Sequence, residues 1–223
     1  MSTSSLRGAL TALAVSAGIV LGAASAQAAT IIWNLDSPPG IPSPNPNTQT
    51  FTAGGITISA NGFMNGNFSG PPNLALFVKT SGGDETGLGS NVDSTGDHEL
   101  NGTQWIQIDF TAARAAGVTD FDFVMGSTTA TQPEAWRVFG SNLATSLGSQ
   151  ILTGNDELVT HDLTGANGAF AYYNFQATQG NVLLASVSGV SAVPEPATWA
   201  MMLLGFVGLG LAFRQSRRKM SLA

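Results

Sequence analysis

The densest group of possible metal ligands lies between Gly82 and Glu99, a segment rich in glycine that contains no lysine or arginine. Carboxylate oxygens are the ligands that calcium prefers, and glycines allow a loop to bend until backbone carbonyls also point inward. The sequence therefore predicts a calcium site that uses some of the five acidic residues of this segment, which are Asp84, Glu85, Asp93, Asp97 and Glu99.

The segment is not an EF-hand loop. Counted from Asn91, several oxygen donors and Gly96 do fall at EF-hand positions, but the twelfth position is Gly102, where that loop needs a bidentate glutamate. Strands rather than helices are also expected on both sides. The second interpretation is a solvated acidic loop whose charges keep a sheet edge from pairing with other chains. The sequence leaves both interpretations open.

The sequence contains few of the residues and motifs that nucleophilic catalysis requires. The chain has no cysteine and no Gly-x-Ser-x-Gly motif, and its two histidines, His98 and His161, are far apart in the sequence. We therefore expect that the protein is not an enzyme.

The charge of residues 29–192 limits the partners of this region. It holds thirteen acidic residues against three basic ones, Lys79, Arg114 and Arg137, which gives a net charge of −10. Such a surface argues against binding to nucleic acid or anionic lipid. A region of this length can bury an independent hydrophobic core, and without cysteine its stability must come from packing.

The periodicity of this region is that of β-strands. Residues 104–110 and 120–125 alternate, so that Ile106, Ile108 and Phe110, and likewise Phe121, Phe123 and Met125, share one face of each strand. Further strands are expected at 30–35, 48–53, 55–60, 74–79, 134–140, 158–163, 169–176 and 181–190. Short strands separated by polar turns predict an all-β fold, an antiparallel β-sandwich.

Two segments interrupt the strand pattern. Residues 111–117, with an alanine-rich centre, are expected to form one or two helical turns. Five of the ten prolines fall between Pro38 and Pro46, so this segment is expected to be an extended loop that lets the first strand cross to the opposite sheet.

The C-terminus combines three features in a fixed order. Pro194, Glu195 and Pro196 cannot continue a helix or a central strand, because proline lacks an amide donor. Ala197 to Phe213 is a run of 17 uncharged residues, which as a helix is about 25 Å long and is expected to cross a bilayer. Four cations follow and favour retention on the cytoplasmic side; they are Arg214, Arg217, Arg218 and Lys219.

The N-terminus has the features of a signal peptide. Arg7 precedes an apolar stretch of small residues, and Ala26 and Ala28 have the small-x-small spacing of a signal peptidase site. We expect cleavage after Ala28. The expected organisation is then a signal peptide at 1–28, an exported sandwich at 29–192, a sorting motif at 193–196, a transmembrane helix at 197–213 and a basic cytoplasmic tail at 214–223.

The C-terminal arrangement resembles the PEP-CTERM protein-sorting signal of Gram-negative bacteria, in the variant written PEPxxWA. Here it reads Pro194-Glu195-Pro196-Ala197-Thr198-Trp199-Ala200, followed by the apolar run and the basic cluster. The resemblance implies that exosortase, a membrane-embedded cysteine protease and transpeptidase, recognises the tripeptide and processes the chain. It also implies that Trp199 anchors the outer interface and the basic cluster the inner one.

A weaker resemblance concerns the exported region. Ala135 to Asn142 is similar to the strand and Gly-Ser-Asn turn of galactose-binding-like jelly rolls. This resemblance implies a jelly-roll-like sandwich that binds a glycan, with calcium as a possible cofactor. Stacking on a sugar ring would then fall to aromatic residues, which are Trp105, Trp136, Tyr172 and Tyr173. The alternative interpretation places these rings in the hydrophobic core, where they contribute most of the burial.

These features lead to three hypotheses. The first is a non-catalytic protein, exported through the inner membrane and anchored by its C-terminus with the domain facing the periplasm. Exosortase processing would then sort it to the cell surface or the extracellular polysaccharide matrix of a biofilm, for a structural or adhesive role. The second is a carbohydrate-binding module, with or without calcium, and the third and least favoured is a hydrolase of matrix polysaccharide.

Overall fold

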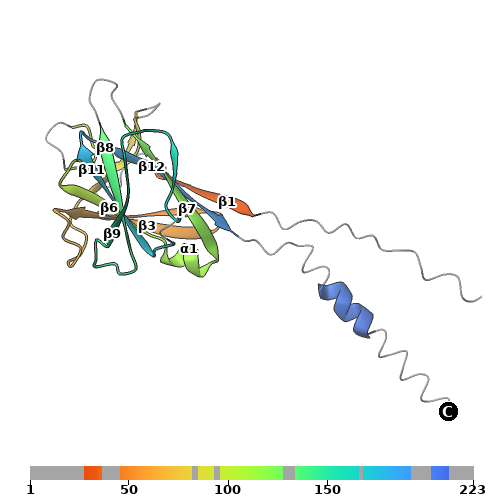
Figure 1. Ribbon diagram of the computed structural model, residues 1–223. Coiled ribbons are helices and arrows are strands. Elements are labelled where there is room, and N and C mark those ends of the chain that lie inside the picture. Colours follow the sequence, from red (N-terminus) through yellow and green to blue (C-terminus); the bar gives the residue numbers. More distant parts are fainter. Residues whose placement is uncertain are drawn as a thin grey trace, which may run out of the picture. The chain divides into compact units, whose positions relative to one another are not determined.

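The computed structural model describes residues 28–36, 46–81, 85–92, 96–127, 134–165, 168–191 and 202–210. Residues 28–193 form one compact unit. Its described part is an antiparallel β-sandwich of two six-stranded sheets, which confirms the predicted fold class (Figure 1).

The first sheet, which we call sheet A, has the strand order β10-β7-β12-β5-β4, and β1 also pairs with β12. Its strands are β1 (Ala29–Asn34), β4 (Leu76–Thr80), β5 (Thr86–Ser90), β7 (Val118–Gly126), β10 (Thr160–Asp162) and β12 (Leu183–Ser191). Strand β12 is central: β7 lies along one edge, while β5 and β1 share the other.

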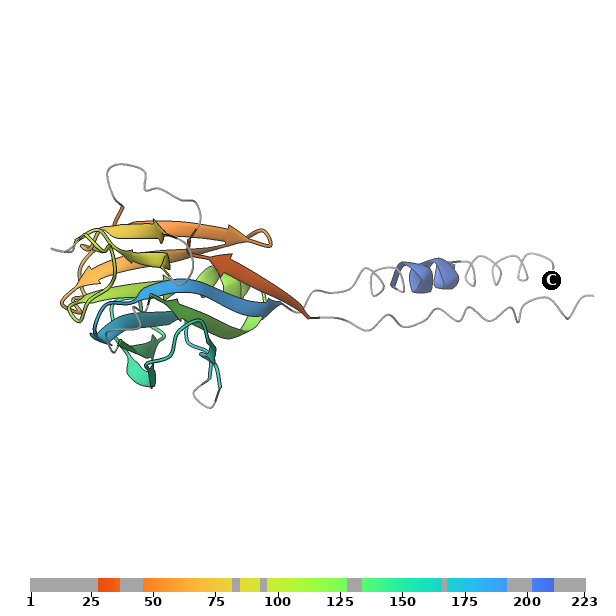
Figure 2. The same ribbon diagram turned by 90° about the horizontal axis from the view of Figure 1, so that it is seen from above.

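The second sheet, sheet B, has the order β2-β3-β6-β11-β8-β9. Its strands are β2 (Thr48–Ala53), β3 (Ile56–Met64), β6 (Gln104–Asp109), β8 (Ala135–Ser141), β9 (Ser149–Gly154) and β11 (Tyr172–Gln179). Figure 2 shows the strands of the two sheets in layers. Strands β1 and β2 lie in different sheets, as expected of the proline-rich connection, whose residues 37–45 lie outside the described residues.

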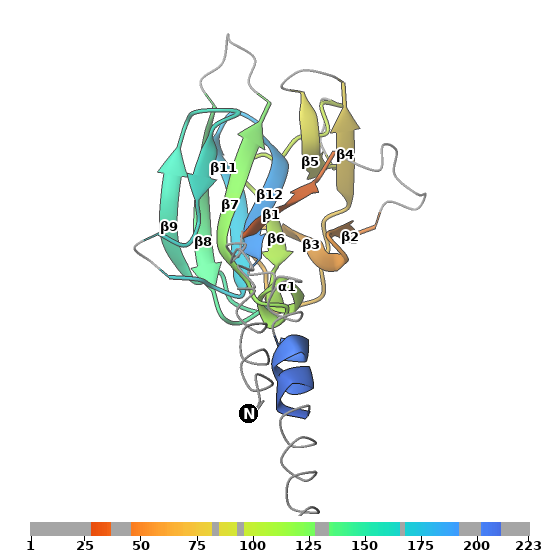
Figure 3. The same ribbon diagram turned by 90° about the vertical axis from the view of Figure 1, so that its right-hand side faces the viewer.

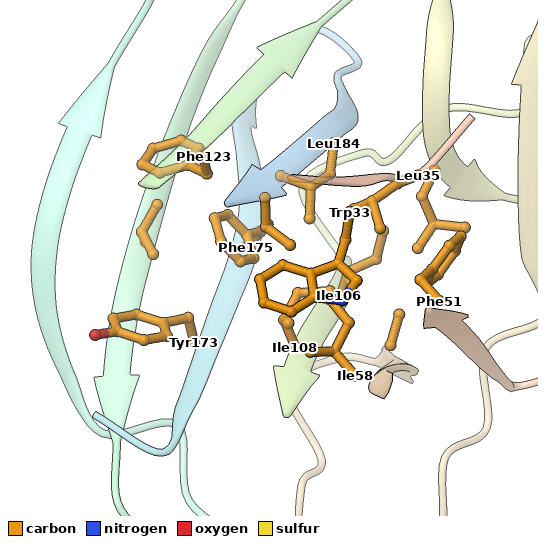
Figure 4. Packing of buried hydrophobic residues seen from close by; sticks show 14 of the residues in the cluster. Trp33, Leu35, Phe51, Ile58, Ile106, Ile108, Phe123, Tyr173, Phe175 and Leu184 are labelled. Atoms are coloured by element: carbon orange, nitrogen blue, oxygen red, sulfur yellow. The ribbon is translucent and has the colours of Figure 1, made fainter. Parts of the chain in front are cut away.

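The core fills the space between the sheets, and its largest buried side chains are aromatic (Figure 4). Phe110, which directly follows β6, stacks on Phe121 of sheet A with ring centroids 4.2 Å apart, and it contacts Trp33 edge to face at 6.0 Å. The alternating residues predicted to face inward are all buried; they are Ile106, Ile108, Phe110, Phe121, Phe123 and Met125. Period-two alternation thus identified the inner face of both sheets correctly.

Helix α1 (Thr111–Ala115) lies within the predicted helical segment. Asp109 supports its start, because the Asp109 carboxylate accepts hydrogen bonds from the Thr111 amide at 2.8 Å and the Thr111 hydroxyl at 2.6 Å. Gly117, with φ of +82°, ends it.

Two strands of the structure were not predicted. Strand β9 (Ser149–Gly154) pairs with β8, and β5 (Thr86–Ser90) lies inside the segment that was expected to be an acidic loop. Glycines weaken an isolated strand, which is why β5 has little sequence signal. In the folded chain the glycines are required by close contacts, because a Cβ on Gly87 would lie 2.8 Å from the carbonyl oxygen of Leu184.

Candidate functional site

The first candidate site is the place where the sandwich joins the C-terminal sorting segment. The last six residues of β12 pair with β1, from Asn34 opposite Ser186 to Ala29 opposite Ser191. On the other edge, Ser191 pairs with Val118 of β7. Figure 3 shows β1 beside β12. The strand that precedes the sorting segment is therefore held on both edges to its last residue.

Strand β1 is fixed to the sandwich by Trp33 and by Leu35, which follows the strand. Trp33 is buried and its indole N–H donates a hydrogen bond to the carbonyl oxygen of Ile56 in sheet B at 2.9 Å. Leu35 is also buried, and its amide donates to the carbonyl oxygen of Ala185 at 3.0 Å. These contacts explain why a six-residue strand at the start of the expected mature chain is stably paired.

The residues expected to direct processing lie mostly outside the described residues. This holds for the sorting residues Pro194, Glu195, Pro196 and Trp199, for the basic residues Arg214, Arg217, Arg218 and Lys219, and for Ala26 of the expected leader. Ala28 is described, is exposed and directly precedes β1.

Residues 202–210 form an α-helix with exposed side chains inside the run 197–213 that was expected to cross a membrane. Within the described residues, no helix reaches the length and hydrophobicity that crossing a membrane requires.

The second candidate site is the acidic segment, residues 82–99, for which the sequence predicted a calcium site. A lysine from outside the segment contacts two of its expected ligands. Lys79 in β4 forms salt bridges and hydrogen bonds with both Glu85 and Glu99. All three side chains are largely buried. Two of the five expected calcium ligands are therefore paired with an ammonium group that the spacing along the sequence did not connect to them.

Burial opposes the charged forms in this cluster. Burial lowers the pKa of Lys79, but hydrogen bonds from its ammonium to Glu85 and Glu99 outweigh this effect and raise the pKa above its ordinary value. Burial raises the pKa of Glu99 despite its hydrogen bonds with Lys79 and Ser127. Two ion pairs thus join β4 to the residue before β5 and to the segment before Leu100.

Of the other three expected calcium ligands, the structure describes only Asp97. Asp97 is exposed, while Asp84 and Asp93 lie outside the described residues. Among residues that the structure describes, no group of three or more histidine, cysteine, aspartate or glutamate side chains could hold a metal ion.

Both histidines pack against aromatic rings. The His98 imidazole stacks on Phe77 with centroids 3.7 Å apart and planes 8° apart. His161 lies against Phe123 and Trp136, and its Nε2 atom is 3.2 Å from Oδ1 of Asp156. Each imidazole thus has a face packed against an aromatic ring.

The aromatic residues expected to stack on sugar rings are mainly buried. Trp136 and Tyr173 belong to the main core, and Trp105 belongs to a second cluster with Phe63, Phe68 and Phe139. Neither indole offers the open ring face that stacking on a sugar needs. Tyr172 is half-buried.

The second cluster lies on the outer face of sheet B, because Trp105 alternates with the inward-facing Ile106. Its polar neighbours hold a covering loop in place. The Gln107 amide donates to the carbonyl oxygen of Ala144 at 3.0 Å, and the Asn174 amide donates to that of Leu147 at 2.9 Å. Sequence reasoning missed these two buried amides, whose only signal was a polar residue at alternate strand positions.

Arg137 covers this cluster. Its guanidinium carbon lies 5.5 Å from the Trp105 ring centroid and 5.3 Å from that of Phe139. Its Nε donates to the Gln176 side-chain oxygen at 2.7 Å. The contact is a cation–π interaction that also shields the rings from water.

Comparison with known proteins identifies the C-terminal segment. Residues 192–219 match the model of the PEP-CTERM protein-sorting motif. No curated protein matches the chain, and no solved structure matches it. The motif begins directly after Ser191, the last residue of β12, and implies export of the chain and C-terminal membrane anchoring before processing by exosortase.

Proposed function

We propose, from the PEP-CTERM motif at residues 192–219, that the chain is a non-catalytic exported protein whose sandwich acts structurally or adhesively outside the cell. In this proposal the leader is removed after Ala28 by signal peptidase. The sandwich faces the periplasm while the tail is anchored in the inner membrane. Exosortase then recognises Pro194, Glu195 and Pro196 and releases or transfers the sandwich to the cell surface or the extracellular polysaccharide matrix.

The motif is the observation that carries this proposal, and the contacts of the sandwich support its non-catalytic part. Both histidines pack on aromatic rings, and Glu99, the most buried carboxylate among the described residues of the acidic segment, is paired with Lys79. The burial of Trp105 and Trp136 favours a structural role over the carbohydrate-binding alternative. A structural role also suits a sandwich in which Gln107 and Asn174 hold a covering loop on one outer face.

The test is processing of a variant in which Pro194, Glu195 and Pro196 are all replaced by alanine. Mass spectrometry of the C-terminus in envelope and medium fractions, with and without exosortase, reports processing. We expect the variant to be exported but to keep its full C-terminus, because the recognised tripeptide is gone.

A matched control replaces Gln215 and Ser216 by alanine, which leaves the tripeptide and all four tail cations in place. This control should be processed like the native chain. Processing of the triple-alanine variant at the native rate would contradict the proposal.

A further inference from the structure

Strand β9 forms one edge of sheet B and lacks two features that usually protect an edge from pairing with another chain. Among the described residues, β9 pairs only with β8. Its six residues, Ser149–Gly154, include neither a charged residue nor a proline, although the exported region has a net charge of −10. The backbone of this edge is therefore open to a further strand.

A β-bulge gives β9 an unusual pattern of faces. Leu152 lies opposite Val138 and Gln150 lies opposite Phe139, so Ile151 is an extra residue between them. Val138 is in the core between the sheets, whereas Phe139 belongs to the cluster on the outer face of sheet B. Ile151 and Leu152 both pack against the core. Two consecutive residues at the centre of β9 therefore face inward.

The rest of β9 makes this pattern symmetric. Thr153 lies opposite Arg137 on the outer face, Gly154 lies opposite the core residue Trp136, and Ser149 faces inward by alternation from its neighbour. The six residues thus face in, out, in, in, out and in. An antiparallel second copy of β9, paired end to end, would place each residue opposite one that faces the same way. A regular six-residue strand could not do this, because inward residues would lie opposite outward ones.

The connections on either side of β9 carry exposed apolar side chains. The described part of the sandwich exposes five large apolar side chains, and three of them lie in these two connections; they are Leu143, Leu158 and Val159. Val159 directly precedes β10, the edge strand of sheet A. This edge is on the same side of the sandwich as β9, because His161 of β10 contacts Trp136, which pairs with β9.

Leu158 is the least expected of these residues. Its side chain is 57% exposed and its φ is +53°. This left-handed conformation is unfavourable for a bulky residue and is tolerated best by glycine, asparagine and aspartate. Neither core packing nor backbone geometry explains a leucine here, whereas an apolar contact with another molecule does.

We infer that two copies of the sandwich associate through β9, antiparallel about a two-fold axis between Ile151 and Leu152. Sheet B then continues from one copy into the other, and Leu158 and Val159 lie in the contact. The symmetric pattern of faces favours a second copy over an unrelated peptide as the added strand. The contact is isologous and closed, as in most dimers. It goes beyond the proposed function and does not depend on processing by exosortase.

Introduced cysteines test the register, because the chain itself has none. In the inferred pairing Gln150 lies opposite Thr153 of the second copy, with Cα atoms about 5 Å apart, a distance that a disulfide spans. Within one chain the two positions are about 10 Å apart, which is too far. The full chain with Gln150→Cys and Thr153→Cys should therefore form a disulfide-linked dimer on mild oxidation in membranes of a strain without exosortase. Either single variant should remain monomeric under the same conditions.

A matched control places two cysteines on the opposite edge of sheet B. Thr50→Cys and Thr52→Cys lie in β2, which is also uncharged, and they would be opposite each other if β2 paired with its own copy about Phe51. We expect no cross-link from this pair. A β9 pair that does not cross-link, or that cross-links no more than the β2 pair, would overturn the inference.

Leu158→Asp tests the apolar part of the contact without straining the fold, because aspartate tolerates a positive φ. Sedimentation of the full chain in detergent should show a dimer weakened about 10-fold or more, since two exposed leucines leave the contact. Val92→Asp, at a side chain that is 50% exposed in another part of the sandwich, should leave the dimer unchanged. Unchanged tryptophan fluorescence shows that both variants are folded. A native chain that sediments as a monomer, or an equal effect of the two substitutions, would contradict the inferred dimer.

Discussion

The carbonyl oxygen of His98 lies over Gly89, and a Cβ built on that glycine would be 2.1 Å from it. The same carbonyl accepts a hydrogen bond from the Ser90 amide at 3.1 Å. The segment that contains His98 is thus hydrogen-bonded to β5, and position 89 must be glycine because a side chain there would collide with the His98 carbonyl.

Replacement of Gly89 by alanine tests this contact. We expect a loss of about 2–3 kcal/mol in the free energy of unfolding, because the opposing atom is backbone and cannot move aside alone. Urea denaturation measures it. Gly70→Ala is the control, since a Cβ there meets nothing within 4 Å, and it should change stability by less than about 0.5 kcal/mol. Equal stability of the two variants would show that the segment is not packed on β5.

The two adjacent tyrosines allow a matched comparison. The Tyr173 hydroxyl accepts a hydrogen bond from the Phe170 amide at 3.0 Å, and its ring is fully buried. Tyr173→Phe should lower the free energy of unfolding by about 1–2 kcal/mol, because the Phe170 amide loses its acceptor. Tyr172→Phe, at a half-buried position, should cost less than about 0.5 kcal/mol. Thermal denaturation of both variants checks the difference, and a larger cost at Tyr172 would contradict the assignment.

Lys79→Met should destabilise the sandwich at neutral pH. It leaves the carboxylates of Glu85 and Glu99 largely buried without their cation, at a cost of about 2 kcal/mol. Burial already raises the pKa of Glu99, so protonation of this group favours the folded state. The stability that protonated Glu99 adds to the folded state is fully present below the ordinary pKa of 4.5. It is lost as the pH rises through the higher pKa of the folded state.

The cost of Lys79→Met should therefore shrink as the pH is lowered toward 4.5. Urea denaturation between neutral pH and pH 4.5 measures this trend. The double variant with Glu99→Gln should recover part of the lost stability at neutral pH, because one of the two uncompensated charges is gone. If the loss of stability in Lys79→Met is the same at every pH, and Glu99→Gln increases it, then uncompensated carboxylate charge is not its cause.

Asp162 gives a pH dependence of the opposite sign. Hydrogen bonds from Gly165 and Thr164 to its carboxylate lower the pKa of Asp162. Its stabilising contribution is present above the ordinary value of 3.8 and is lost as the pH falls through the lower folded pKa. Asp162→Asn should thus reduce the loss of stability on acidification in this range.

Asp97→Asn, at an exposed position, is the control for Asp162→Asn. Chemical denaturation at a series of pH values below 4.5 compares the slopes. If the two variants have the same slope, the hydrogen bonds at Asp162 do not hold its charged form.

The sequence by itself determined the features that depend on neighbouring residues. Alternation in residues 104–110 and 120–125 identified the inner faces, because successive side chains of a strand point to opposite sides. The sorting motif is equally local, since Pro194 to Trp199 and the cations beyond them form one continuous segment. Local patterns alone were therefore sufficient to predict the fold class and the sorting tail.

Only the tertiary structure decided which distant residues meet. Ala29 and Ser191 are 162 positions apart and pair directly. Lys79 reaches Glu99, and the two glycines of β5 lie against the backbone of Leu184 and of His98. Gln107 and Asn174 are buried because a loop folds over them. Each of these contacts joins residues that are far apart in the sequence, and its free energy depends on how the folded chain brings them together. Local patterns therefore identified the residue types but not the partners that they contact.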